Sequence, residues 1–146
     1  MKKTLFFSVL SLIVATTFLS SCSKYDEGSK FTLLSKKSRM VNDWHLISQT
    51  ENGFALNLSG VSWHLTLSKD GTAKTTFSYT IAGQTLTNEI NGEWLFSNDK
   101  SKLILVDASN NTSEEYTIIK LTNSELKVQQ IDPSNGDITI QTWETM

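Results

Sequence analysis

The chain has 146 residues, of which 13 are basic and 15 acidic, so its formal net charge is −2. This balance gives no reason to expect nucleic acid as a partner, because nucleic-acid-binding domains are usually strongly basic. A single proline and regular turn signals argue against disorder, and the length suits one domain with one core.

The first element in chain order is a predicted signal peptide over residues 1–21. Lys2 and Lys3 precede an apolar run from Leu5 to Leu19 that serine and threonine interrupt. The run is shorter than the roughly 20 apolar residues that a spanning helix needs. Cleavage would remove two of the 13 basic residues and none of the 15 acidic ones, leaving 11 against 15 and a net charge of −4.

The signal segment ends in Leu19-Ser20-Ser21-Cys22, which resembles the bacterial lipobox. The resemblance implies that Cys22 is acylated on sulfur and becomes the new N-terminus. Residues 22–31 would then be a lipidated tether, and the membrane a partner through Cys22. The alternative is an ordinary secretory signal with an incidental thiol, but no A-x-A site is present and an exposed cysteine is a liability in an oxidising envelope.

The lipobox resemblance places the protein in the cell envelope, anchored by lipid and expected at the outer membrane. Asp26-Glu27, just after the cysteine, is similar to the acidic sorting signals of Bacteroidetes surface lipoproteins. A plain solvated linker is the other interpretation, so the periplasmic and the surface face both stay open.

A short helix is predicted over Ser35–Val41, where a serine cap precedes apolar residues at helical spacing. It could cover one end of the following domain. Lys36, Lys37 and Arg39 form a basic cluster with three interpretations: a solvated helix face, a patch that contacts anionic lipid headgroups, or a contact in which Arg39 stacks on Trp44.

The rest of the predicted domain, residues 32–146, consists of alternating apolar and polar segments, the pattern of half-buried strands. Lys69-Asp70-Gly71 is the turn of one hairpin. Short connections favour antiparallel neighbours, and closure would remove exposed edges. The fold class is therefore all-β, an eight-stranded antiparallel up-and-down barrel with a short N-terminal helix. The eight predicted strands are Trp44–Thr50, Val61–Ser68, Ala73–Ile81, Thr85–Phe96, Leu103–Val106, Glu115–Leu121, Glu125–Ile131 and Ile138–Glu144.

Several stretches carry a resemblance to a known family. They are Asn42-Asp43-Trp44, W-H-L-T-L-S-K-D-G-T, Gly92-Glu93-Trp94 with S-N-D-K-S-K-L-I-L after it, and Y-T-I-I-K-L-T-N-S-E-L-K-V. Together, over roughly Ser35 to Val128, they resemble the lipocalin-like domain of small Bacteroidetes cell-envelope lipoproteins. The family implies a lipocalin-type barrel that binds a small apolar molecule. In contrast to typical lipocalins, Asn42 stands where the first strand's G-x-W motif has glycine.

The alternation directs large side chains into the barrel, and five of them are the candidate ligand-binding residues: Trp63, Leu65, Phe77, Tyr79 and Trp94. An eight-stranded barrel is just wide enough to be filled by side chains or to hold one small ligand. Two functions follow. The first is a lipid-anchored carrier or binder of a small apolar molecule, and the second is a structural or interaction module whose filled barrel contacts another envelope protein or a glycan.

Catalytic and metal sites are not expected. His45 and His64 fall on neighbouring strands, opposite in phase to the tryptophans, and lack the further ligands that a metal ion needs. The chain has no G-x-S-x-G and no H-E-x-x-H motif. Glu114 and Glu115 are adjacent strand residues that point to opposite faces, so they cannot act together on one substrate. We therefore expect no enzyme and no cofactor.

Overall fold

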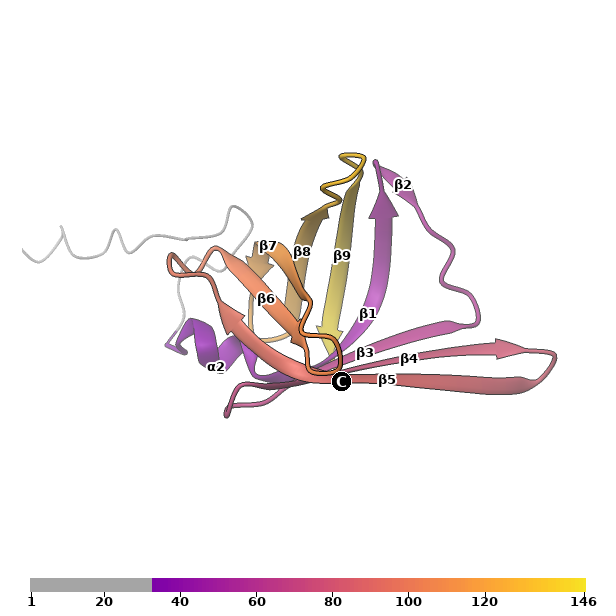
Figure 1. The fold of residues 1–146 in the computed structure, drawn as a ribbon, viewed down its shortest axis with the longest axis horizontal. Coiled ribbons are helices and arrows are strands. Elements are labelled where there is room, and N and C mark those ends of the chain that lie inside the picture. Colours follow the sequence, from indigo (N-terminus) through magenta and orange to yellow (C-terminus); the bar gives the residue numbers. More distant parts are fainter. Residues whose placement is uncertain (1–32) are drawn as a thin grey trace, which may run out of the picture.

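The computed structural model describes residues 33–146, so the predicted signal peptide, the tether and Cys22 lie outside the described residues. The described part is a helix followed by nine strands (Figure 1). Their bounds are α2 Lys36–Met40, β1 Asn42–Glu51, β2 Phe54–Ala55, β3 Val61–Leu67, β4 Thr72–Ile81, β5 Gln84–Phe96, β6 Lys102–Asp107, β7 Ser113–Leu121, β8 Glu125–Ile131 and β9 Ile138–Thr145.

The strands form one closed antiparallel barrel. The sheet order is β2-β1-β3-β4-β5-β6-β7-β8-β9, and β1 also pairs with β9, which closes the sheet through eight strands. The register of β1 and β9 shifts by one residue between Leu46 and Ser48. The eight-stranded up-and-down barrel is thereby confirmed. The additional strand β2 has only two residues, pairs with the end of β1, and was not predicted.

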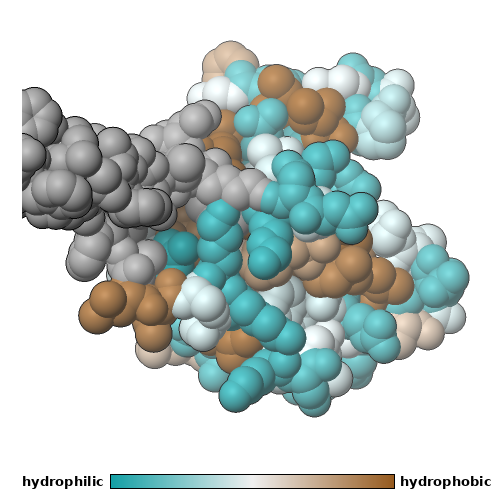
Figure 2. All heavy atoms as spheres, turned by 90° about the vertical axis from the view of Figure 1, so that its left-hand side faces the viewer, coloured by the Kyte–Doolittle hydropathy of each residue, from teal (hydrophilic) through white to brown (hydrophobic). Residues whose placement is uncertain are grey.

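Helix α2 closes one end of the barrel. The Ser35 side chain caps it as predicted, since the Ser38 backbone N donates to Ser35 Oγ at 3.1 Å. Met40 is fully buried, and Trp44 Nε1 donates to the Met40 carbonyl at 3.0 Å. We call this side, with the turns after β3, β5 and β7, the closed end. Figure 2 views the molecule from this side and shows polar residues interspersed with apolar ones.

The basic residues of α2 make contacts other than the predicted one. Arg39 is buried, and its Nη1 donates to the Leu121 carbonyl at 2.6 Å. The cation over an indole face is Lys37, whose Nζ lies 5.9 Å from the ring centroid of Trp94. Stacking of Arg39 on Trp44, one of the three interpretations of the basic cluster, was wrong, because the guanidinium donates to a strand-end carbonyl instead.

At the opposite end, which we call the open end, the β4–β5 hairpin projects beyond the other strands (Figure 1). The two strands pair from Thr72 with Glu93 to Ile81 with Gln84, whereas β5 pairs with β6 only from Gly92 onward. Gly92 is where β5 passes from one partner to the other. A Cβ at Gly92 would lie 1.9 Å from the Val106 carbonyl oxygen, so glycine is required for this close approach.

The core lies between the closed end and the middle of the barrel. Among the inward-facing residues of β3 and β5, Leu65, Leu67 and Trp94 are buried, with 3%, 1% and 5% of their surface exposed. Trp63 and Phe77 are only partly buried, because both lie toward the open end, where the barrel flares. The strand phase is nevertheless correct, since these residues alternate with outward-facing neighbours.

Candidate functional site

The barrel contains a cavity of about 360 Å³. Its lining is apolar toward the closed end, and toward the open end it has an aromatic side and a polar side. Leucines from β3, β6 and β8 and the indoles of β3 and β9 form the apolar part, which is made of Trp63, Leu65, Leu103, Leu105, Leu126, Val128 and Trp143. Small-molecule sites usually have volumes of about 300–1,000 Å³, so this space suits one small ligand.

The five candidate ligand-binding residues of the sequence analysis are placed in different surroundings. Trp63 and Leu65 line the cavity. Phe77 and Tyr79 continue from Trp63 along the inner face of the β4–β5 hairpin, with ring centroids 4.4 Å apart for Trp63 and Phe77 and 5.5 Å apart for Phe77 and Tyr79. Trp94 lies on the closed-end side of the cavity, where its Nε1 donates to the Ser68 carbonyl at 2.8 Å. Trp63, Phe77 and Tyr79 therefore form a continuous aromatic side of the barrel, and the five residues do not make one ring around a ligand.

Across the cavity from β4, the lining carries three amides. Gln49 of β1, Gln130 of β8 and Gln141 of β9 all face inward near the open end. Gln141 Nε2 donates to Gln49 Oε1 at 3.3 Å. One wall of the open end is thus aromatic and the other can donate and accept hydrogen bonds.

Two carboxylates and a phenol complete the lining at this end. Tyr116 of β7 donates its hydroxyl to Glu114, and burial followed by this hydrogen bond raises the pKa of Tyr116. The phenol therefore stays a neutral donor. Asp107 of β6 accepts hydrogen bonds from the Ser109 side chain and backbone N, both at 2.7 Å, which lower the pKa of Asp107. Glu114 lines the cavity and is also exposed, so the cavity reaches solvent here.

A family model described as the lipocalin-like domain matches residues 40–128, more than half of the chain. The chain belongs to this family. The match begins in α2 and ends in β8, so it includes both the closed end and most of the cavity lining. No curated protein matches the chain.

Solved structures resemble this lipocalin-like barrel at low sequence identity. A protein from Bacteroides uniformis is 20% identical with a TM-score of 0.53, and the match covers 75% of this chain and 90% of that one. An odorant-binding protein from bovine nasal mucosa is 12% identical with a TM-score of 0.46, covering 80% and 77%. Japanin from Rhipicephalus appendiculatus, bound to cholesterol, is 12% identical with a TM-score of 0.48, covering 73% and 75%. The likeness to the Bacteroides uniformis protein shows that the two chains share a fold.

The polar residues that line the cavity were not predicted from the sequence. Glu114 and Glu115 do point to opposite faces, since Glu115 contacts Lys102 outside the barrel while Glu114 lines the cavity. The signal was present, because Glu114 is in phase with Tyr116 and Ile118, the inward residues of β7. Polar residues at inward positions near a strand end mark the open part of a barrel rather than an error in phase.

The two histidines lie side by side on the outer face of the lipocalin-like barrel. His45 of β1 pairs with His64 of β3, and their ring centroids are 5.0 Å apart. Within residues 33–146, no group of three or more histidine, cysteine or acidic residues is arranged to hold a metal ion. The same residues include no helix that is long and apolar enough to span a membrane.

Proposed function

We propose that this protein is a lipid-anchored binding protein of the cell envelope that holds one small, mainly apolar molecule in the barrel. The observation that carries the proposal is the cavity of about 360 Å³ with an apolar interior and a polar open end. Such a site removes most of a ligand's apolar surface from water while a few polar groups orient it. Binding, rather than catalysis, is the activity that this lining supports.

The cavity also weighs against a barrel filled by its own side chains. The aromatic residues that would fill the centre lie to one side, as Trp63 and Phe77 follow the flared β4–β5 hairpin. The space that they leave is bounded by small and medium side chains such as Ala73, Thr75 and Val128. This arrangement favours a ligand over a purely structural role.

The test compares two substitutions at adjacent positions of β4. Thr75 lines the cavity, opposite Leu65 and Ile90, whereas Thr76 pairs with His64 and Glu89 on the outer face. Thr75→Phe should fill the cavity and abolish binding of a long-chain alcohol such as dodecanol, while Thr76→Phe should leave it unchanged. Binding is followed by tryptophan fluorescence, since Trp63 and Trp143 line the cavity. If the parent protein does not bind the alcohol and carries no copurified lipid by mass spectrometry, the proposal fails.

Anchoring is the second part of the proposal and rests on the lipobox resemblance of Leu19 to Cys22. Acylation at Cys22 would hold the protein at a membrane, expected to be the outer membrane, because two or more chains anchor firmly where one is marginal. Cys22→Ser should abolish incorporation of a labelled fatty acid and membrane association while the barrel still folds. Persistent labelling of the variant would contradict the anchor, and protease shaving of whole cells distinguishes the surface from the periplasmic face.

A protein- or glycan-contacting module is the second candidate, and one observation favours it. The projecting β4–β5 hairpin exposes Ile81 and Leu86, which are 64% and 52% exposed. Exposed apolar residues on a projecting element are typical of contact sites. If Ile81→Ser with Leu86→Ser leaves dodecanol binding intact but abolishes a pull-down partner from envelope extracts, the hairpin serves a contact separate from the cavity.

A further inference from the structure

The charge of the cavity lining is one-sided. Its described residues include two carboxylates, Asp107 and Glu114, and no lysine, arginine or histidine. Both carboxylates lie at the open end, above an interior formed by Leu103, Leu105 and Val128. A ligand that buries an apolar chain in this interior must place its head group beside them.

The two carboxylates lie on adjacent strands at the same end of the barrel. Glu114 of β7 pairs with Leu105 of β6, and Asp107 follows Leu105 by two residues, so Asp107 and Glu114 are diagonal neighbours on adjacent strands, and both line the cavity. Diagonal pairs of this kind have Cα atoms about 7–8 Å apart, which leaves room for a small cation between the carboxylates.

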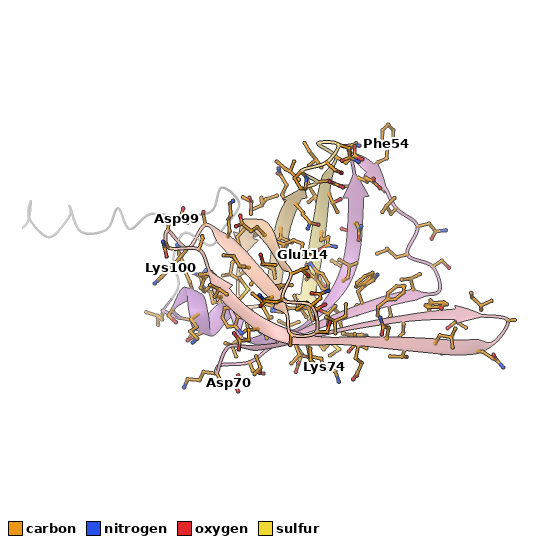
Figure 3. The ribbon with its side chains drawn as sticks, in the orientation of Figure 1. Phe54, Asp70, Lys74, Asp99, Lys100 and Glu114 are labelled. Carbon is orange, nitrogen blue, oxygen red and sulfur yellow. The ribbon has the colours of Figure 1, made fainter. Side chains whose placement is uncertain are left out.

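The basic residues of the strands are directed elsewhere. Three ion pairs on the barrel surface join Lys74 to Glu89 at 2.5 Å, Lys102 to Glu115 at 2.6 Å and Lys120 to Glu125 at 2.7 Å. Figure 3 shows Lys74 projecting from the β4–β5 hairpin on the side away from the barrel, and Glu114 on the barrel side. Within the described chain, none of these three ion pairs involves Asp107 or Glu114.

Neighbouring groups hold the carboxylates in place without neutralising them. Tyr116 donates its hydroxyl to one oxygen of Glu114, and Ser109 donates to Oδ1 of Asp107. These donors are neutral, and Glu114 has a second oxygen that can accept from a ligand. The glutamines across the cavity can bind a polar head but do not supply a positive charge.

We propose that the cavity selects a single-chain amphiphile whose head is an ammonium group, such as a long-chain amine, and discriminates against fatty acids. This inference rests on the proposed function of the cavity. The chain lies among Leu103, Leu105 and Val128, and the ammonium lies between Asp107 and Glu114. A carboxylate head at the same place meets two like charges and no cation, which is how a site rejects a wrong ligand.

The experiment compares three probes that share a chain and differ in head group: dodecylamine, dodecanol and dodecanoate. Their dissociation constants are measured with the parent protein at neutral pH, each below its critical micelle concentration. We expect dodecylamine to bind about three- to tenfold more tightly than dodecanol, the range for partly exposed charges acting together, and dodecanoate to bind most weakly. The preference should decrease with added salt, since the carboxylates are accessible to solvent.

Two adjacent substitutions with the same change of charge separate the cavity from the surface. Glu114→Gln should reduce the preference for dodecylamine over dodecanol, whereas Glu115→Gln, on the outer face, should leave it as in the parent. Circular dichroism verifies that both variants are folded. The inference is overturned if Glu114→Gln leaves the ratio of the dodecylamine and dodecanol dissociation constants unchanged, or if dodecanoate binds as tightly as dodecylamine. In either case the proposed function still stands as long as dodecanol binds. If none of the probes binds, both are overturned.

Discussion

Arg39 and Leu121 are 82 positions apart in the sequence, yet Arg39 Nη1 donates to the Leu121 carbonyl at 2.6 Å. The bond joins helix α2 to the last residue of β7 and lies in a buried environment. It satisfies the carbonyl of a residue at the end of a strand. The closed end of the barrel is therefore held by a polar contact as well as by the apolar packing of Met40 and Trp44.

Removing this side chain should destabilise the barrel. Arg39→Ala is expected to lower the free energy of unfolding by about 1.5–3 kcal/mol, the usual range for a hydrogen bond to a charged group. Lys37→Ala, which removes the exposed contact with Trp94, should lower it by about 0.5–1 kcal/mol. Urea denaturation measures both, and equal effects of the two substitutions would contradict the role given to Arg39.

The fold could be predicted from the sequence because the alternation of apolar and polar residues shows which side chains of a strand point into the barrel. In β3, the inward residues Leu65 and Leu67 alternate with outward ones, and the same period recurs in all eight predicted strands. The same alternation does not show how far along the barrel axis a side chain lies. Trp63 and Phe77 point inward as predicted but lie in the flared part, where fewer neighbours cover them. Strand β2 was missed because two residues carry no period.

The cavity could not be predicted from the aromatic content for the same reason. Large inward residues fill a barrel only if they lie at the same height, and Trp63, Phe77 and Tyr79 instead extend outward along one hairpin. Inward polar residues were the more informative signal. Glu114 and Gln130 each continue the inward phase of an apolar strand toward the open end, which indicates where the core stops.

Trp94 provides a test of the packing between the cavity and the closed end. Its Nε1 donates to the Ser68 carbonyl at 2.8 Å, and its ring lies edge-on to Phe96 with centroids 5.6 Å apart. Trp94→Phe should lower the free energy of unfolding by about 1 kcal/mol through the lost hydrogen bond, and Trp94→Ala by about 3–5 kcal/mol. Chemical denaturation measures the difference, and an alanine effect below about 1 kcal/mol would mean that the ring does not support the core.

Three turn aspartates should make the barrel less stable in acid. Hydrogen bonds from Thr72, Ser109 and Ser134 lower the pKa values of Asp70, Asp107 and Asp132 below the ordinary 3.8. Because the folded-state pKa values are depressed, their contribution is fully present above the ordinary carboxyl pKa. It is lost as the pH falls through the lower folded values.

The measurement is the thermal midpoint between neutral pH and about pH 2, the interval that includes the ordinary and the lowered carboxyl pKa values. The parent protein should lose stability over the acidic part of this range. A variant with all three aspartates replaced by asparagine should lose less, because asparagine has no carboxyl to protonate. Parallel curves for the two proteins would show that these carboxyls are not linked to folding.

Gly92 connects the projecting hairpin to the barrel, and the last prediction concerns its backbone. β5 pairs with β4 up to Glu93 and with β6 from Gly92 onward, so both partners meet at this residue. A Cβ there would lie 1.9 Å from the Val106 carbonyl oxygen and 2.9 Å from its carbon. These are backbone atoms, so β6 must move to accept a side chain.

Gly92→Ala should therefore lower the free energy of unfolding by about 1–3 kcal/mol, as overpacking does. Asn91→Ala, at the exposed neighbouring position, should stay within about 0.5 kcal/mol. Since Asp107 pairs with Gly92, moving β6 also shifts a carboxylate of the cavity. We expect Gly92→Ala to weaken dodecylamine binding even under conditions in which the variant is fully folded. Unchanged stability and unchanged binding would mean that β6 can move to accept the alanine side chain without disturbing the cavity.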